Sequence, residues 1–326
     1  MKNKTLAIVG ATGLVGQTFI KILQEEKNNK YNLKLFASEK SANKKIRFFE
    51  DMLEINTLDE NSFDDVDYAL FFTNEDISKV FIPIALKKNV VVIDNSSAFR
   101  MDENVKLVAF GANEESICLN DKLISNPNCC CIQSVKILSK LVKYKINKIT
   151  YNTYQSVSGS GKQGIDDLLR CRKGLMPLFY DSDISFTCIP KIGEYKDNNF
   201  TSEEEKLMQE TKKILKNNQI DVLATCVRVP IMFSHGISIN VEFENDFQIK
   251  EIINDLSKDK DIVICDNIIP TSVLSCKNDK VYVGRIRKYN KQLLLYCVAD
   301  NIRVGAATNA YKILEYYIKL RGDLWN

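Results

Sequence analysis

TLAIVGATGLVG (residues 5–16) combines a short apolar strand, a glycine turn and the start of a helix. Strands this apolar are typical of the buried centre of a parallel sheet, and a helical pattern continues through Ile22 and Leu23. In such a unit, glycines let the backbone approach a pyrophosphate that sits on free helix N–H groups. The spacing is GxxGxxG instead of GxGxxG, and glycines also serve plain tight turns. Its place at the start of a βαβ unit favours dinucleotide binding.

Strand and helix patterns alternate after this turn. We expect strands at 32–37, 67–73 and 90–93 and a helix at 77–87. This βαβαβ order predicts an α/β fold with a doubly wound parallel sheet of Rossmann type, which binds its ligand at the carboxyl ends of the strands.

The loop after the second strand bears on the cofactor. NAD-binding folds place an acidic residue there to bind the ribose hydroxyls, but this chain has Ser38, Lys40 and Ser41. Hydroxyls and a lysine suit a 2′-phosphate and favour NADP. Glu39 lies among them, and a solvated loop without cofactor contacts is the alternative.

The second half of the chain has a different pattern. Long strand-like runs at 148–157, 221–229, 235–243, 280–286 and 292–298 predict a mixed, mainly antiparallel sheet, with helices at about 161–174, 203–217 and 247–258. We expect an α+β domain over 129–303, whose exposed sheet mates with a partner subunit. Residues 1–128, joined by the C-terminal segment 304–326, would form the NADP-binding domain.

The segment SNPNCCCIQ (125–133) connects the two predicted domains. Leu123 and Ile124 end a short strand, residues 126–128 are Asn-Pro-Asn, which is typical of a turn, and a helical pattern follows. Cys129 would therefore stand at a helix start, where N–H groups and the helix dipole favour a thiolate nucleophile. The alternative is that all three cysteines are buried and pack as small apolar residues.

Composition excludes several classes of function. Forty-five basic and 42 acidic residues leave a net charge of +3, too balanced to indicate a nucleic acid or an anionic membrane as partner. The uncharged run 5–20 is too short to span a bilayer, and we find no signal peptide. Ten cysteines without a disulfide-framework spacing predict the reducing cytoplasm, and a single histidine excludes His-rich metal sites, so we expect no metal.

Strings spread over nearly the whole chain carry a family resemblance. They are GATGLVG (10–16), VVIDNSSAFR (91–100), SNPNC (125–129), TYQSVSGSG (153–161), TSEEEKLMQETKKIL (201–215), TCVRVP (225–230), VGRIR (283–287) and VADNIRVGAATNA (298–310). In these strings and their order the chain resembles the aspartate-semialdehyde dehydrogenases. The resemblance implies NADP-dependent, reversible reductive dephosphorylation of L-aspartyl 4-phosphate in lysine, threonine, methionine and diaminopimelate biosynthesis, by a homodimer or homotetramer.

The resemblance also implies roles for single residues. Cys129 would be the nucleophile, His235 the general acid/base, and Gln155 the residue that orients the substrate. Arg228 would hold the α-carboxylate and Glu203 the α-amino group. Phosphate would meet Arg100, Lys206 and Asn128, although an arginine such as Arg100 is more often in a surface ion pair, and Glu203 with Lys206 could be a solvated pair. Cofactor contacts would come from Gly10, Thr12, Gly13, Leu14, Val15, Ser38, Lys40, Ser41, Ser158, Gly159 and Asn309.

These residue types suit that chemistry. A thiolate adds to the aldehyde, hydride leaves to the nicotinamide, and phosphate attacks the resulting thioester. A bidentate arginine holds a carboxylate well, and cations hold phosphate. An imidazole can take up the hydroxyl proton near neutral pH, and His235 is the only histidine of the chain.

Three departures from the family pattern stand beside the resemblance. Gly236-Ile237 replaces the usual Ser-Glu after the histidine, and Cys130-Cys131 replaces Ser-Thr. Asn74-Glu75 replaces Ala-Gly after the third strand and predicts a bulkier, acidic edge of the cofactor site.

Two other functions remain open: an N-acetyl-glutamyl-phosphate reductase, and a non-catalytic NADP-binding regulator. The free carboxylate of Glu203 argues against the first, and the retained Cys129 and His235 argue against the second.

Overall fold

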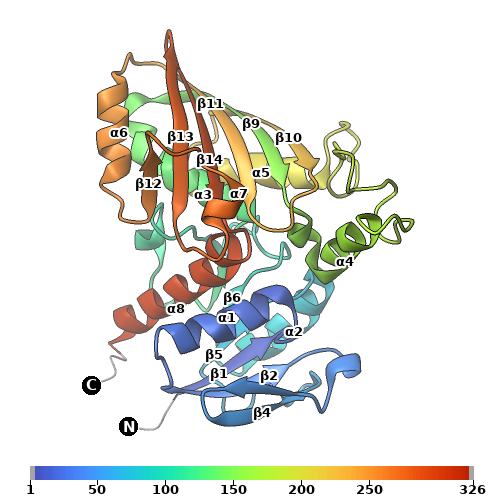
Figure 1. The fold of residues 1–326 in the computed structure, drawn as a ribbon. Helices are drawn as coiled ribbons and strands as arrows, with labels where there is room; N and C mark the ends of the chain where they lie inside the picture. Colours follow the sequence, from blue (N-terminus) through green and yellow to red (C-terminus); the bar gives the residue numbers. More distant parts are fainter. Residues whose placement is uncertain (1–3, 323–326) are drawn as a thin grey trace. The chain divides into compact units, whose positions relative to one another are not determined.

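The computed structural model describes residues 4–322, which divide into two compact units (Figure 1). The first contains the chain through Phe110, Glu114–Pro127 and the segment from Ala306 on. The second contains Gly111–Asn113 and Asn128–Gly305. The ends of the predicted first domain, residues 1–3 and 323–326, lie outside the described residues. Each unit has its own sheet.

The first unit is an α/β unit. Its elements are β1 Lys4–Val9, α1 Leu14–Glu25, β2 Tyr31–Phe36, β3 Lys45–Phe48, β4 Asp51–Asn56, β5 Tyr68–Phe71, α2 Glu75–Lys87, β6 Val91–Asp94, β7 Lys106–Leu107, β8 Leu123–Ser125 and α8 Thr308–Arg321. The strand order is β3-β4-β2-β1-β5-β6-β8-β7, parallel throughout except for the β3/β4 pair. Because the chain runs outward from β1 through β2 and then returns to β5 on the other side, the predicted doubly wound sheet is confirmed.

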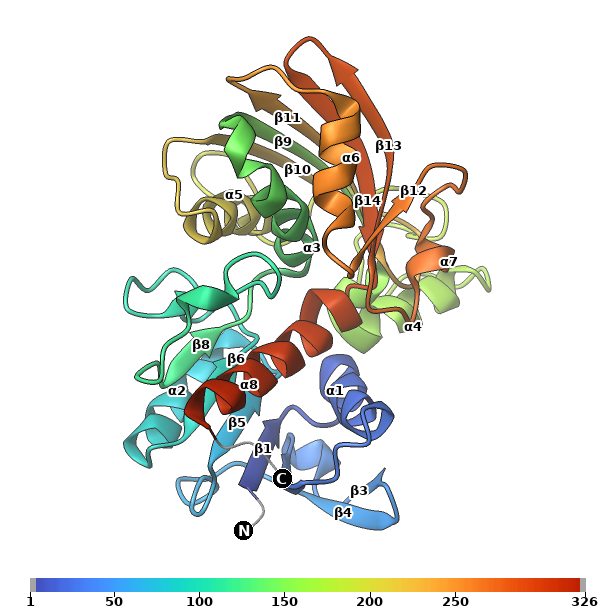
Figure 2. The ribbon, with the colours of Figure 1, turned by 90° about the vertical axis from the view of Figure 1, so that its left-hand side faces the viewer.

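Strand β1 lies at the centre of this unit and is buried on both faces. Leu6 and Ile8 pack in one apolar cluster with residues of α1 and α8, and Figure 2 shows these two helices side by side. Ala7 and Val9 pack in a second cluster with residues of α2. This alternation follows from the period of two in a strand, and it explains the continuous apolar run at 6–9.

The β3/β4 hairpin was not predicted. Its strands carry many exposed and charged side chains at the edge of the sheet, so they lack the apolar pattern of a buried strand. Helix α2 also begins two residues earlier than predicted. Asn74 caps it, because its side chain accepts a hydrogen bond from the Ile77 N–H at 3.1 Å.

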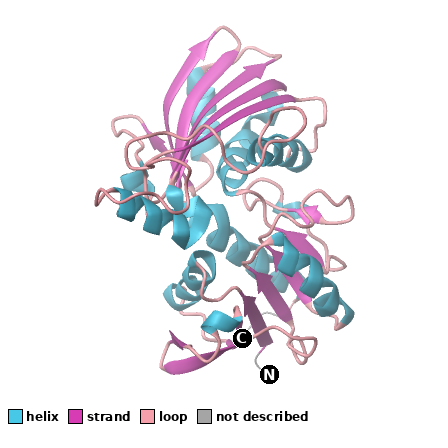
Figure 3. Ribbon diagram, turned by 90° about the vertical axis from the view of Figure 1, so that its right-hand side faces the viewer, coloured by secondary structure: helices cyan, strands magenta, loops and turns pink. Residues whose placement is uncertain are grey.

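The second unit contains α3 Cys129–Leu138, β9 Ile146–Gln155, α4 Gly161–Cys171, α5 Ser202–Ile214, β10 Asp221–Arg228, β11 His235–Phe243, α6 Ile249–Ser257, β12 Ile262–Cys265, α7 Ser272–Ser275, β13 Val281–Tyr289 and β14 Gln292–Ala299. Its strands form one sheet, drawn in magenta in the upper part of Figure 3. Their order is β10-β9-β11-β14-β13-β12. The inner neighbours are antiparallel and the outer strands β10 and β12 pair in parallel, so the mainly antiparallel, mixed sheet is confirmed.

The strands of this sheet bury one face more than the other. In β9, Ile149, Tyr151 and Thr153 are buried, whereas Tyr154 is 41% exposed. Strand β9 begins and ends two residues before the predicted range, and β12 and α7 were not predicted. Helix α5 starts where Thr201 and Glu204 form a capping box, one residue before the predicted start.

All ten cysteines of the chain are free thiols. Within residues 4–322, no helix combines the length and the apolar character that a membrane crossing requires.

Candidate active site

Helix α3 begins at Cys129. Asn128 caps it, because its Oδ1 accepts hydrogen bonds from the N–H groups of Cys130 at 2.8 Å and Cys131 at 3.4 Å. The Asn128 N–H donates to the buried carboxylate of Glu210 at 2.6 Å. Cys130 and Cys131 are fully buried, whereas Cys129 keeps partial exposure. Of these three thiols, only Cys129 is therefore accessible to a substrate.

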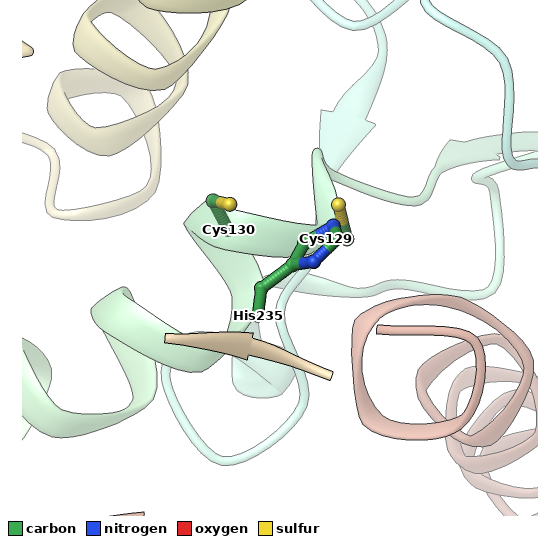
Figure 4. Close-up of side chains that lie close together, drawn as sticks. All are labelled: Cys129, Cys130 and His235. Atoms are coloured by element: carbon green, nitrogen blue, oxygen red, sulfur yellow. The ribbon is translucent and has the colours of Figure 1, made fainter. Parts of the chain in front are cut away.

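The Cys129 thiol is acidic. Its pKa lies well below the usual value, first because the Cys130 thiol acts as a hydrogen-bond donor to the thiolate, and further because of His235, against the opposing effect of burial. The pKa of Cys130 itself is raised well above its usual value, first by burial. Figure 4 shows Cys129 beside the His235 ring. The two sulfur atoms and a ring nitrogen of His235 lie within 4.8 Å of one another.

His235 is the first residue of β11 and is fully buried. Its Nδ1 accepts a hydrogen bond from the Ser156 N–H at 3.0 Å, and the Ser156 hydroxyl is also 3.0 Å away. The N–H favours the ring with its proton on Nε2. In the other neutral form the Ser156 hydroxyl can accept a hydrogen bond from Nδ1–H, but the Ser156 N–H then loses its acceptor. Nε2 has no hydrogen-bond partner among the described residues. It is therefore free to exchange a proton with a substrate.

A polar network behind the ring was missed by the sequence analysis. Asn301 Oδ1 accepts hydrogen bonds from the hydroxyls of Ser156 and Ser158, at 3.2 and 3.1 Å, and from the Ser234 N–H at 3.0 Å. Ser234 has a φ of 72°, which is uncommon outside glycine. The network thus holds both sides of His235. Ser156, Ser158 and Asn301 lie in the strings TYQSVSGSG and VADNIRVGAATNA, which was the available signal, whereas Ser234 lies in neither.

The Glu203 carboxylate links the N-terminus of α3 to the end of β9 through hydrogen bonds. Its Oε1 accepts from Asn128 Nδ2 at 2.9 Å and from Gln155 Nε2 at 3.1 Å. Burial raises the pKa of Glu203, but the Asn128 hydrogen bond and the charges of Lys206 and Arg228 outweigh it and leave the pKa below its usual value. Glu203 is therefore a carboxylate at neutral pH, with Lys206 one turn later on α5.

Arg228 ends β10 and is buried. Its Nη1 donates to the Ser156 carbonyl at 2.7 Å and lies 3.5 Å from Gln155 Oε1. Gly159 leaves room for it, since a Cβ there would lie 2.7 Å from Nη1 and 3.3 Å from the His235 ring. The second unit thus brings together the predicted site residues Cys129, His235, Gln155, Glu203, Arg228, Lys206, Asn128, Ser158 and Gly159.

The remaining predicted residues lie in the first unit. Arg100 is buried and donates to the Asn95 carbonyl at 2.8 Å. Burial raises the pKa of the neighbouring Asp94, and the charge of Arg100 acts against that rise. Asn309 donates to the Val108 carbonyl and to Asn126 Oδ1 and accepts from the Phe110 N–H, at 2.9, 2.6 and 2.7 Å. The side chain of Asn309 is thus held by hydrogen bonds within its own unit.

A cavity of about 400 Å³ lies at the carboxyl end of β1. Gly10 lines it with a φ of +86°, and a Cβ there would lie 2.2 Å from the Phe72 carbonyl oxygen, so only glycine fits. The predicted Thr12, Gly13 and Ser38 also line it, and so does Glu39. The predicted Leu14, Val15, Lys40 and Ser41 are not among its lining residues. The lining also includes residues that the sequence analysis missed: Val9, Ala37, Thr57, Leu58, Phe72, Thr73, Ile77 and Phe81.

Known proteins match the chain over nearly its whole length. Family models match residues 5–119 (semialdehyde dehydrogenase, NAD binding domain) and residues 138–304 (semialdehyde dehydrogenase, dimerisation domain). The chain is 40% identical to the aspartate-semialdehyde dehydrogenase of Aquifex aeolicus over 96% of this chain and 98% of that protein. For the Bacillus subtilis protein of that name, identity is 36% over 97% of each chain. The crystal structure of aspartate semialdehyde dehydrogenase II from Vibrio cholerae, complexed with ASA, matches with a TM-score of 0.93 and 36% identity over 98% of this chain and 99% of that one.

Proposed function

Because the chain belongs to the aspartate-semialdehyde dehydrogenase family of NADP-dependent enzymes in amino-acid biosynthesis, we propose that its second unit carries the acyl-transfer chemistry. The observation that supports this is the cluster of Cys129, His235 and Glu203 with Gln155 and Arg228. It offers a thiolate, a proton-exchanging nitrogen and two opposite charges for an amino acid.

The reaction begins at the Cys129 sulfur. The thiolate adds to the aldehyde carbon, and His235 Nε2 exchanges a proton with the oxygen on that carbon. When bound, NADP⁺ would accept the hydride whose loss converts the thiohemiacetal into a thioester. The lone pair of Nε2 receives the hydroxyl proton in this direction, and its N–H donates to the oxygen in the reverse direction. Ser156 supports both because it can bond either form of the ring.

Three residues would recognise the amino-acid part of the substrate. Arg228 offers its guanidinium to the α-carboxylate, and Glu203 offers its carboxylate to the α-ammonium group. Gln155 lies between them and would orient the carbonyl: its Nε2 donates to Glu203 and its Oε1 faces Arg228. An N-acetylated substrate has no ammonium group for Glu203, which argues against the reductase alternative.

Phosphate contacts would come from Lys206 and Arg100. Lys206 lies one helical turn after Glu203, and Arg100 follows the strand β6 at the carboxyl end of its sheet. Asn128 is a further proposed contact. It would have to give up its hydrogen bond to Glu203, because its carbonyl oxygen caps α3.

The cofactor would bind at the cavity of the first unit. Its glycine turn precedes the N-terminus of α1, which suits a pyrophosphate. Ser38 lines the cavity, and Lys40 and Ser41 follow in a short 3₁₀ helix, so a 2′-phosphate would meet hydroxyls and a cation. Ser158, Gly159 and Asn309 are the further proposed cofactor residues.

A second copy of this chain is the proposed partner. The less buried face of the second unit's sheet presents Tyr154 and Leu223, which are 41% and 37% exposed, with Tyr296 beside Tyr154. Covering such side chains is what an interface between copies does. A homodimer built this way, alone or paired into a homotetramer, fits the dimerisation-domain match over 138–304. Ten free thiols suit the reducing cytoplasm.

One assay with three arms tests the function. The purified chain with L-aspartate 4-semialdehyde, phosphate and NADP⁺ should form NADPH continuously, and it should stall without phosphate because the thioester lacks its acceptor. NAD⁺ should support slower turnover, since it lacks the 2′-phosphate. N-acetylglutamate semialdehyde should react poorly. NADP binding without turnover of either semialdehyde would instead identify a regulator.

A further inference from the structure

We propose that Cys129, Cys130 and His235 form a binding site for Zn²⁺, and that zinc bound there inhibits the enzyme reversibly. The three donor atoms come from the first two residues of α3 and the first residue of β11 (Figure 4). They lie within 4.8 Å of one another. Two sulfurs and one imidazole nitrogen form a donor set that zinc prefers, and a water molecule can complete the tetrahedron.

The imidazole nitrogen is available. His235 is fully buried, and Nε2 has no hydrogen-bond partner among residues 4–322. Zinc needs Nε2 without a proton, so the ring proton must lie on Nδ1. The Ser156 hydroxyl, 3.0 Å from Nδ1, can accept a hydrogen bond from this N–H, and a zinc-bound histidine usually has such an outer hydrogen bond. The Ser156 N–H then loses Nδ1 as its acceptor, which is the cost of this form.

The geometry requires only a small contraction. A tetrahedral zinc ion holds sulfur and nitrogen ligands about 3.5–3.8 Å apart, so the donor atoms must approach by about 1 Å. Cys129 can make this movement because it lies in the first turn of α3 and is partly exposed. No side chain from Gly159 or Gly305 blocks it. A Cβ at Gly305 would lie 2.7 Å from the Cys129 Cβ, and one at Gly159 would lie 3.3 Å from the His235 ring.

The charges match a divalent cation. Two thiolates neutralise Zn²⁺, and the negative charge of Glu203 acts on both cysteines. The Arg228 guanidinium opposes this attraction from the side of Gly159.

Cys130 supplies the second sulfur of this site. A serine in its place would offer zinc no thiolate. With serine there, one sulfur and one nitrogen would remain. The zinc site is an addition to the proposed function. Metal binding can be measured on the resting protein whether or not Cys129 is the nucleophile.

Turnover of the full-length protein at buffered free Zn²⁺ concentrations is the first measurement. Zinc should inhibit the wild type, and a chelator should restore activity. Cys130→Ser should raise the half-inhibitory zinc concentration about tenfold or more, because a thiolate ligand is lost. Cys131→Ser is the matched control and should respond as the wild type does, since Cys131 Sγ faces Thr211. Equal inhibition of the wild type and Cys130→Ser would overturn the proposal.

Cobalt spectroscopy gives a readout without turnover. Co²⁺ in place of zinc should give the wild type the visible bands of a tetrahedral ion and a thiolate-to-cobalt band with the intensity of two thiolates. In Cys130→Ser that intensity should fall to about half. If this variant does not fold, the wild-type spectrum decides: a band of one thiolate, or none, contradicts the site.

Discussion

Cys129 and Cys130 are neighbours in sequence with opposite acidities. The pKa of Cys129 is lowered and that of Cys130 is raised, because the buried Cys130 thiol keeps its proton and donates it in a hydrogen bond to the Cys129 thiolate. The departure from the family's serine therefore bears directly on the nucleophile. It keeps a hydrogen-bond donor at this position while changing the oxygen to sulfur.

The first prediction concerns the pH dependence of alkylation. A lowered pKa means that the thiolate persists below the ordinary cysteine value of about 8.5, so Cys129 should be alkylated rapidly at neutral pH and lose reactivity only at lower pH. Cys130→Ala should move the midpoint upward, because the largest cause of the shift is removed. Cys131→Ala should leave it unchanged. Peptide mapping that finds the label chiefly on Cys130 or Cys131 would contradict this assignment.

Arg228→Lys should be harmful although it keeps the charge. An ammonium group cannot reproduce the fork that holds a carboxylate from two sides, so kcat/KM should fall by an amount equivalent to about 2–4 kcal/mol. Arg172→Lys is a suitable control, because Arg172 is exposed and donates to the Pro230 carbonyl. An unchanged kcat/KM in Arg228→Lys would remove Arg228 from the substrate site.

Motifs could predict the residues that are proposed to act on the substrate, but not the residues that hold them in place. Cys129, His235 and Arg228 lie in recognisable strings, and the structure places them in one cluster. Asn301 acts through hydrogen bonds to residues 67 to 145 positions away. Position 305 needs glycine because a Cβ there would lie 2.7 Å from the Cys129 Cβ. Contacts of this kind depend on the three-dimensional arrangement, and no periodicity indicates them.

At the scale of elements, β11 shows how the Gly236-Ile237 departure is accommodated. Ile237 is fully buried in the sheet, whereas a Cβ at Gly236 would lie 1.8 Å from the Tyr296 hydroxyl. The tyrosine of the neighbouring strand β14 thus occupies the space that a side chain at position 236 would need. Hydrogen bonds to the His235 ring come instead from Ser156, whose hydroxyl in turn donates to Asn301.

Gly236→Ser should therefore destabilise the fold despite restoring the family's residue. The outer end of the partly exposed Tyr296 side chain must be displaced, so the free energy of unfolding should fall by about 1 kcal/mol, at the low end of overpacking costs, measurable by urea denaturation. Tyr296→Ala in the same chain should recover most of the loss. If Gly236→Ser alone is as stable as the wild type, the tyrosine does not restrict this position.

Element types were easier to predict than element ends. The buried strands β1 and β6 and the amphipathic helices α4 and α5 follow clear periodicities, so the sequence predicts them. The exposed β3/β4 hairpin has no such pattern, and the shift of β9 by two residues follows from pairing with β10 and β11 along its whole length. Caps at Asn74 and Thr201 set two helix starts through hydrogen bonds that depend on the local chain geometry.

At the scale of the whole molecule, we propose that the first unit binds the dinucleotide and that the second carries the covalent chemistry. The proposed boundaries, 1–128 with 304–326 and 129–303, place the strand–turn–helix of residues 5–16 in the first domain and Cys129 at the start of the second. The central claim is that the thioester forms on Cys129, because every other proposed role serves that intermediate.

Rapid mixing with L-aspartate 4-semialdehyde and NADP⁺ in the absence of phosphate tests this claim most directly. We expect a burst of about one NADPH per active site, followed by a stall, with the acyl group found on Cys129 by peptide mass spectrometry. Cys129→Ser should show no burst. Steady NADPH formation without phosphate, or an acyl group on any other residue, would show that the thioester does not form on Cys129.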